Sequence, residues 1–193
     1  MCRLAVLVLL LLLMPAQAQD SPASAVFVDR GSVTTLVFVD LNTGEQHRVE
    51  VEGEHFTVFG DTVMLFDPRN REVELVGADG RRRLHPFIVL TSSESRVDWT
   101  VSADGKRIAW TTIIGAAPGS ISTVTRVADI EGANARTVFQ ETRDDGLRAK
   151  PVAFSPDDAT LYLDYQPDGL DALTVFPQFA GLFSLGLSSD DPP

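Results

Sequence analysis

Acidic side chains near the C-terminus are the first group in this sequence whose type and spacing could support chemistry. Asp164, Asp168 and Asp171 frame a Pro-Gly loop, and calcium favours such carboxylate ligands. Their spacing nevertheless differs from that of an EF-hand loop. An ordinary polar loop is therefore the preferred interpretation, with a weak calcium site as the alternative.

The histidines form the second candidate group. His47 and His55 flank a segment with three glutamates, but a metal site needs ligands that converge, and these fall on different expected strands without a third anchor. We expect a solvated hairpin edge here and assign no role to His85. No Ser/His/Asp set, Cys/His pair or phosphate loop has usable spacing, so we assign no catalytic, cofactor-binding or metal-binding residue and no cofactor.

Composition limits the classes of partner. The chain has 193 residues, with 16 Lys+Arg against 27 Asp+Glu, and its net charge is −11. This balance argues against binding to nucleic acid or to anionic lipid, because both need clustered Lys and Arg. Hydrophobic residues make up 44% of the sequence, which is enough for a folded core.

The N-terminus has the organisation of a cleavable secretory signal peptide. A basic residue precedes the apolar run 4–14, and a proline and an Ala-Gln-Ala site follow it, up to Ala18. The run is shorter than the ~20 apolar residues that span a bilayer, and we expect no membrane span in the mature chain. We predict that residues 1–18 are removed and that 19–193 is exported to a bacterial periplasm or the extracellular space. Cys2, the only cysteine, would leave with the signal, so no disulfide would stabilise the exported chain.

The remaining sequence predicts an all-β fold. Helical periodicity is nearly absent, and short runs rich in Val, Ile, Phe, Thr and Leu are separated by Gly, Asp, Asn and Pro. Two runs, 36–39 and 63–66, are apolar at every position, which predicts sheets covered on both faces. The predicted strands are 25–28, 35–40, 46–51, 55–59, 62–67, 72–77, 83–87, 96–101, 107–113, 122–129, 136–140, 150–154, 160–165 and 182–187.

Two similar segments indicate a structural repeat. The segment 97–110 reads VDWTVSADGKRIAW, and 151–163 reads PVAFSPDDATLYL. In each, a strand leads into a Ser-x-Asp turn whose carboxylate can accept backbone N–H bonds. Gly105, or Asp158 in the second copy, is expected in the left-handed conformation. The other structural turn residues are Ser102, Asp104, Ser155 and Asp157.

These turns resemble the Ser-Pro-Asp-Gly-Lys turn of TolB-type, WD-repeat-like β-propellers. The segment 40–45, which reads DLNTGE, resembles the outer hairpin of the same blades. The resemblance covers most of 25–193 and implies a propeller-like array of about 3.5 to 4 four-stranded antiparallel blades. With only three strands expected in the first and last blades, the propeller would be incomplete. The expected partial propeller domain is 19–193, with blades near 25–51, 55–87, 96–140 and 150–193.

The family implies exported scaffolds that bind proteins or ligands in a central channel or on a rim. Some relatives carry a fused serine-peptidase domain, but no Gly-x-Ser-x-Gly elbow occurs here, so that activity is not carried over. We expect a non-enzymatic module that binds a protein or cell-envelope partner, with a homodimer through an unpaired terminal blade as a further option. The alternatives are a fragment or relative of a propeller-containing hydrolase or lyase, and a truncated remnant without independent function. Converging polar residues at the blade axis would favour the enzyme.

Two insertions, Gly115–Ser120 and Pro167–Gly181, are expected to emerge on one side of the array. Phe176 and Phe179 would place aromatic rings there, as a partner-binding rim, because loops commonly carry binding function. The alternative is a loop packed on its own blade. Four further aromatic residues are expected to fill space between blades: Trp99, Trp110, Phe154 and Tyr162.

Overall fold

The computed structural model describes residues 24–117, 120–167, 179 and 181–187. These residues form fourteen strands and no helix, which confirms the all-β prediction. In this part of the chain no helix is long and apolar enough to cross a membrane. The expected signal peptide, 1–18, lies outside the described residues.

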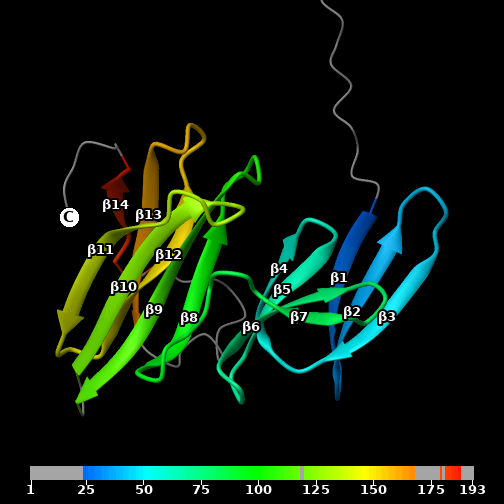
Figure 1. The fold of residues 1–193 in the computed structure, drawn as a ribbon, viewed down its shortest axis with the longest axis horizontal. Coiled ribbons are helices and arrows are strands. Elements are labelled where there is room, and N and C mark those ends of the chain that lie inside the picture. Colours follow the sequence, from blue (N-terminus) through cyan, green and yellow to red (C-terminus); the bar gives the residue numbers. More distant parts are fainter. Residues whose placement is uncertain (1–23, 118–119, 168–178, 180, 188–193) are drawn as a thin grey trace, which may run out of the picture.

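The strands form four small antiparallel sheets that follow one another along the chain (Figure 1). Sheet A has the order β1-β2-β3, sheet B β4-β5-β6-β7, sheet C β11-β10-β9-β8 and sheet D β12-β13-β14. The strands are β1 Ser24–Arg30, β2 Thr34–Asp40, β3 Gln46–Val51, β4 Glu54–Phe59, β5 Thr62–Asp67, β6 Glu72–Gly77, β7 Arg82–Leu84, β8 Glu94–Val101, β9 Arg107–Ala117, β10 Ser120–Asp129, β11 Arg136–Arg143, β12 Leu147–Phe154, β13 Thr160–Pro167 and β14 Phe183–Gly186.

Each sheet packs a face against the next sheet, and sheet B shows the principle most clearly. Successive side chains of a strand point to opposite faces. In β5, Val63 and Leu65 join an apolar cluster with Leu36 and Phe38 of sheet A. Their neighbours in β5 join another cluster, with Val97, Trp99, Ile108 and Trp110 of sheet C. The prediction that both faces of 63–66 are covered is therefore confirmed.

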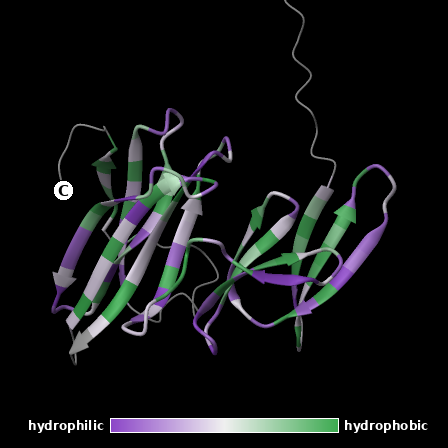
Figure 2. Cartoon of the chain, in the orientation of Figure 1, coloured by the Kyte–Doolittle hydropathy of each residue, from purple (hydrophilic) through white to green (hydrophobic). Residues whose placement is uncertain are grey.

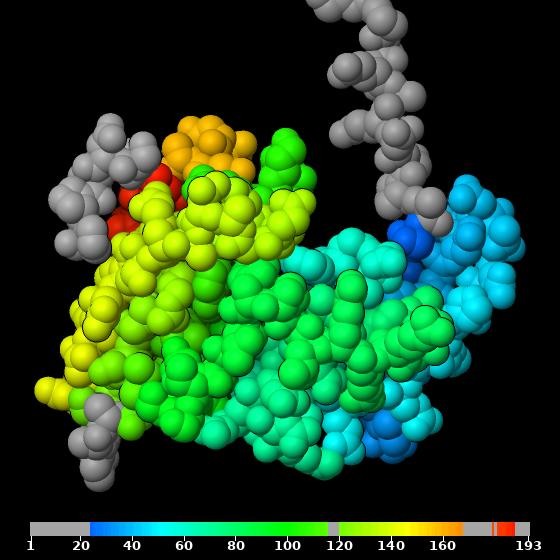
Figure 3. All heavy atoms as spheres, viewed as in Figure 1, coloured from blue at the N-terminus to red at the C-terminus, as the bar shows by residue number. Residues whose placement is uncertain are grey.

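A third cluster joins sheets C and D. Ala109 and Val127 of sheet C pack against Leu161 and Leu163 of sheet D. In the space-filling view the sheets accordingly follow one another as contiguous bands of colour (Figure 3). The chain thus has three cores in series, each of them shared by two consecutive sheets.

Sheet A departs from the expectation for its central strand. Leu36 and Phe38 face sheet B, but the cluster on that side is the only one to which β2 contributes in the described part of the chain. Val37 lies on the other face, opposite Phe27, and is only 7% exposed, although Phe27 itself is 59% exposed. The prediction for 36–39 is therefore confirmed as to burial, but in the described part of the chain no second sheet covers the face of Val37.

Two further expectations need correction. Gly115–Ser120 is not a long insertion, because β9 continues to Ala117 and Gly115 pairs with Ile121 of β10. Tyr162 does not fill space between sheets, since it alternates with Leu161 and Leu163 and is 36% exposed. Among the described residues the four sheets form no closed ring or barrel, and their interpretation as propeller blades stays a prediction.

The two Ser-x-Asp turns have the same hydrogen bonds. The Ser102 hydroxyl donates to Asp104 and accepts the Arg107 N–H, and the Asp104 carboxylate accepts the Lys106 N–H at 3.0 Å. These bonds, with that from Ser102 first, lower the pKa of Asp104 to about 2. The left-handed position is held by Gly105, with φ of 72°.

In the second copy, Ser155 and Asp157 take the corresponding places, with bonds to the N–H groups of Thr160 and Ala159. Asp158, with φ of 56°, replaces the glycine. Aspartate is among the residues that tolerate this conformation best. Both turns therefore close their hairpins by the same geometry, although their sequences differ at the left-handed position.

Candidate functional site

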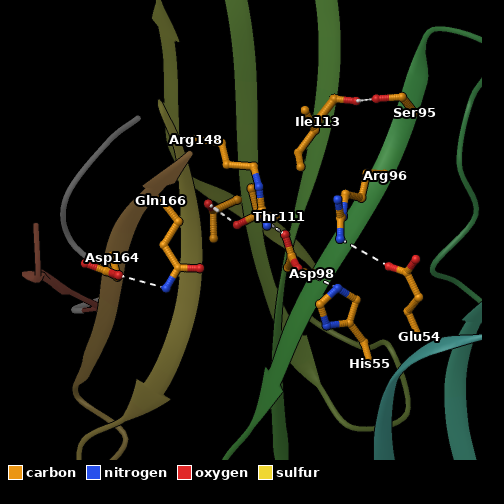
Figure 4. Close-up of polar contacts among 11 residues, drawn as sticks. Glu54, His55, Ser95, Arg96, Asp98, Thr111, Ile113, Arg148, Asp164 and Gln166 are labelled. Carbon is orange, nitrogen blue, oxygen red and sulfur yellow. Dashed lines mark hydrogen bonds and ion pairs between the residues drawn. The ribbon is translucent and has the colours of Figure 1, made fainter. Parts of the chain in front are cut away.

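The first strands of sheets B, C and D bring together a cluster of charged side chains that the sequence did not reveal. These strands, β4, β8 and β12, belong to different sheets, and β8 contacts both of the others through side chains (Figure 4). We call the group formed by His55, Asp98 and Arg148 the charge cluster. It is the strongest candidate for a functional site among the described residues.

Asp98 is the centre of the charge cluster. Its side chain is fully buried, one carboxylate oxygen lies 3.0 Å from Nε2 of His55, and the other accepts a hydrogen bond from Nη1 of Arg148. The Arg148 side chain is also fully buried, whereas that of His55 is 18% exposed. A buried carboxylate is thus paired with one cation and with one imidazole.

The pKa of Asp98 records the balance of these effects. Burial acts to raise the pKa, but the hydrogen bond from His55 and the charges of Arg148, His55 and Lys150 together lower it to about 2. Asp98 is therefore an anion at neutral pH despite its complete burial. Burial and the charged partners therefore act on this pKa in opposite directions, and the partners decide the outcome.

Local backbone geometry explains how His55 reaches sheet C. The pairing of β4 with β5 shifts register between Glu54 and Thr57, and His55 has φ of 55°. A bulge of this kind redirects a side chain out of the regular alternation. The imidazole consequently lies against Trp99 in an edge-to-face arrangement, with ring centroids 5.8 Å apart, and faces Asp98.

Further contacts between the same strands surround the charge cluster. Trp99 donates from Nε1 to the Thr57 hydroxyl at 3.0 Å, and Arg96 pairs with Glu54 at 3.1 Å. On the other side of β8, Thr100 donates to the carbonyl oxygen of Val152 in β12, at 3.1 Å. Strand β8 is therefore joined to both neighbouring sheets by polar contacts as well as by apolar packing.

A second buried carboxylate lies in sheet D. Asp164 is fully buried and accepts hydrogen bonds from the Gly181 N–H at 2.8 Å and from the Gln166 side chain at 2.9 Å (Figure 4). The other two residues of the acidic loop, Asp168 and Asp171, lie outside the described residues. Within the described part of the chain, no three His, Cys, Asp or Glu side chains are placed to hold a metal ion.

The expected solvated edge applies to only one of the two histidines. His47 has a side chain that is 53% exposed and lies 3.3 Å from Glu45, as expected. The same expectation for His55 is wrong, because its strand faces sheet C and not solvent. Its partners Asp98 and Arg148 come from strands distant in the sequence, so that no local spacing signals the contact.

His85, to which the sequence assigned no role, is buried at the edge of sheet B. Its Nδ1 accepts the Ile88 N–H at 3.1 Å, and its ring contacts Phe59 and Phe87 edge-on. Burial lowers its pKa to about 4, so the imidazole is neutral at pH 7. It lines a pocket of about 320 Å³ together with the exposed side chains of Leu84 and Val89.

The expected aromatic rim is described only in part. Phe179 is 57% exposed, and the nearby Leu182 is 55% exposed. Phe176, the other expected partner-binding residue, lies outside the described residues. Phe179 therefore remains a candidate contact residue with an exposed ring.

The chemistry open to the charge cluster is limited by its burial. A carboxylate that orients an imidazole is an arrangement used by hydrolases, but there the imidazole must reach a nucleophile or a substrate. Here Arg148 occupies the second carboxylate oxygen of Asp98, and both side chains are inaccessible. The cluster is thus suited to joining three sheets.

The sequence matches no protein-family model and no curated protein.

Proposed function

We propose that this chain is an exported, β-propeller-like module of the TolB type, whose sheets act as blades and which binds a protein or cell-envelope partner without catalysis. The single observation that carries the proposal is the complete burial of Asp98 and Arg148 against each other. Because these charged residues, which converge where the sheets meet, pair with each other inside the protein, we assign the binding function to the protein surface. Four antiparallel sheets packed in series support the propeller-like interpretation.

Exposed apolar side chains near the C-terminal sheet support a binding surface. Phe179 and Leu182 are more than half exposed, and aromatic anchors of this kind dominate many protein interfaces. Their exposure also means that they contribute little to the core. Replacing them should therefore affect binding without a large loss of stability.

Photo-crosslinking in intact cells would test the binding proposal. A photoreactive phenylalanine analogue at Phe179 should give an adduct with an envelope protein. The matched control is Val58, which is 56% exposed but lies on sheet B. Adducts at both positions alike, or at neither in a folded and exported protein, would contradict the proposal.

Sequencing the N-terminus of the periplasmic form would test the expected cleavage after Ala18.

The second candidate function is that of a hydrolase or lyase relative, and the pairing of His55 with Asp98 is the observation that favours it. His55 alone in the charge cluster retains some exposure, so it would have to be the group that meets a substrate. A screen of ester, peptide and uronate substrates with the wild type and with His55→Asn would decide. Activity that is present in the wild type and lost in the variant would establish the enzyme; we expect none in either.

A further inference from the structure

The free edge of β1 differs from the other sheet edges of the described chain. β1 pairs with β2 on one side only, in a regular ladder of seven residue pairs without a register shift. Its outward N–H and C=O groups are therefore available for another strand. The stretch Ser24–Val28 carries no charge, proline or lysine, which are the usual devices that block such pairing.

The remaining edges are shorter, more charged or in contact with a neighbouring sheet. At the far edge of sheet A, β3 carries His47, Arg48 and Glu50 and is coloured as largely hydrophilic in Figure 2. At the outer edges of sheets B and C, β7 has three residues, two of them arginine, and β11 is charged at both ends. At the edge of sheet D, β14 has four residues. Among these outer edges of the described chain, β1 has the longest uncharged stretch, which is the five residues Ser24–Val28.

We propose that β1 pairs antiparallel with β1 of a second copy of this chain, centred on Phe27, to give a continuous sheet across the dimer. The centre of the strand reads Val-Phe-Val in both directions, so an antiparallel copy presents the same side chains. Phe27 then faces its counterpart, and Val26 faces the partner's Val28. This inference is independent of the binding function proposed above, because it needs only the sheet order and the sequence of β1.

The faces of sheet A agree with this register. Val26 packs against the cluster shared with sheet B, and Val28 lies on the same face but is 38% exposed. In the dimer, Val28 would contact the partner's Val26. On the opposite face the two Phe27 rings, each 59% exposed in the single chain, would cover one another.

The charged end of β1 also fits an antiparallel copy better than a parallel one. In the antiparallel register Asp29 lies opposite the partner's Ala25, and Arg30 lies opposite the partner's Ser24. A parallel copy in register would place Asp29 against Asp29 and Arg30 against Arg30, which is unfavourable for like charges. The charge pattern therefore favours the antiparallel orientation, and the register rests on the Val-Phe-Val centre of the strand.

Disulfide trapping tests the register directly. Opposite residues in an antiparallel pair lie within the separation that a disulfide spans. In a Cys2→Ser background, Phe27→Cys should form cross-linked dimers under mild oxidation. Ala25→Cys and Asp29→Cys should each fail alone but cross-link when mixed. The control is Val58→Cys, with a similar exposure on another sheet.

Sedimentation equilibrium of the Cys2→Ser protein gives the thermodynamic counterpart. Phe27→Lys places like charges opposite each other and should weaken self-association about ten-fold, while Val58→Lys should not change it. Circular dichroism establishes that each variant is folded. A monomer at all concentrations, self-linking of Ala25→Cys, or cross-linking no greater than that of Val58→Cys would overturn the proposal.

Discussion

Asp98 and His85 are both buried titratable groups, and they differ in what surrounds them. Asp98 meets an arginine and a histidine, and its pKa falls to about 2, so that it keeps its charge inside the protein. His85 meets the edges of Phe59 and Phe87, and its Nε2 has no hydrogen-bond partner among the described residues. Its pKa falls to about 4 through burial, so that it loses its charge.

The comparison shows that burial alone does not determine the charge state of a group. Desolvation opposes ionisation at both sites, and only the partners of Asp98 reverse the outcome. Asp98 consequently depends on three sheets at once, through residues on β4, β8 and β12. His85 depends mainly on the apolar packing of its own sheet and of the segment that leads to sheet C.

The largest expected effect comes from removing the central anion. Asp98→Ala removes the buried carboxylate that pairs with the fully buried Arg148 side chain, and we expect a loss of about 3–5 kcal/mol in the free energy of unfolding. Urea denaturation followed by circular dichroism measures it. The double variant Asp98→Leu/Arg148→Met should recover most of the loss, because it buries no charge. A double variant as unstable as Asp98→Ala would contradict this account.

Acid should destabilise the protein first through His85. The unfolded-state pKa is about 6.5 and the folded-state pKa about 4, so the unfolded chain binds a proton that the folded chain excludes. The contribution of His85 to the free energy of unfolding is fully present above pH ~6.5, and about 3 kcal/mol of that free energy is lost as the pH falls to ~4. Asp98 adds a loss only below pH ~3.8, as its carboxylate becomes protonated. Thermal melts of wild type and His85→Gln across this range should separate the two steps.

A smaller effect is expected at His55, which donates to Asp98 from the more exposed side. His55→Asn should cost about 1–2 kcal/mol, because Asp98 loses one charge-assisted hydrogen bond and retains Arg148. Asparagine is chosen because it tolerates the positive φ at this position. Urea titration at pH 7 measures the change. A loss as large as that for Asp98→Ala would mean that His55, and not Arg148, is the main partner.

The smallest expected effect is that of salt. The difference in stability between wild type and Asp98→Ala should change by less than about 0.5 kcal/mol between low salt and ~1 M NaCl, because buried pairs are screened little. Paired urea titrations in the two buffers measure it. A strong salt dependence would show that water reaches the charge cluster.

Much of the secondary structure could be predicted from the sequence. The predicted strands 62–67 and 72–77 coincide with β5 and β6, because apolar runs and Asp- or Gly-containing turns are local signals. β9 is longer than predicted, since Gly115 and the following alanines lack strand propensity and are held by pairing with β10. Pairing of this kind is a tertiary effect that local patterns do not carry.

The charge cluster could not be predicted in the same way. His55 looked solvated because glutamates surround it, and its orientation depends on a bulge that no turn residue announces. Strand alternation places Asp98 on the opposite face from Trp99. This alternation alone does not indicate that Asp98 is buried or that it has a partner. A charged residue between Val97 and Trp99, together with an unexplained arginine in a strand, was the available signal.

The arrangement of Asp98 and Arg148 has a consequence for the order in which the molecule becomes complete. As the chain leaves the ribosome, sheets A, B and C can form one after another, each with its own hairpins. Asp98 meets its arginine only when sheet D has emerged, so an intermediate that ends after sheet C holds an anion without its main counter-charge. Chaperone binding and proteolysis should therefore concentrate on that intermediate.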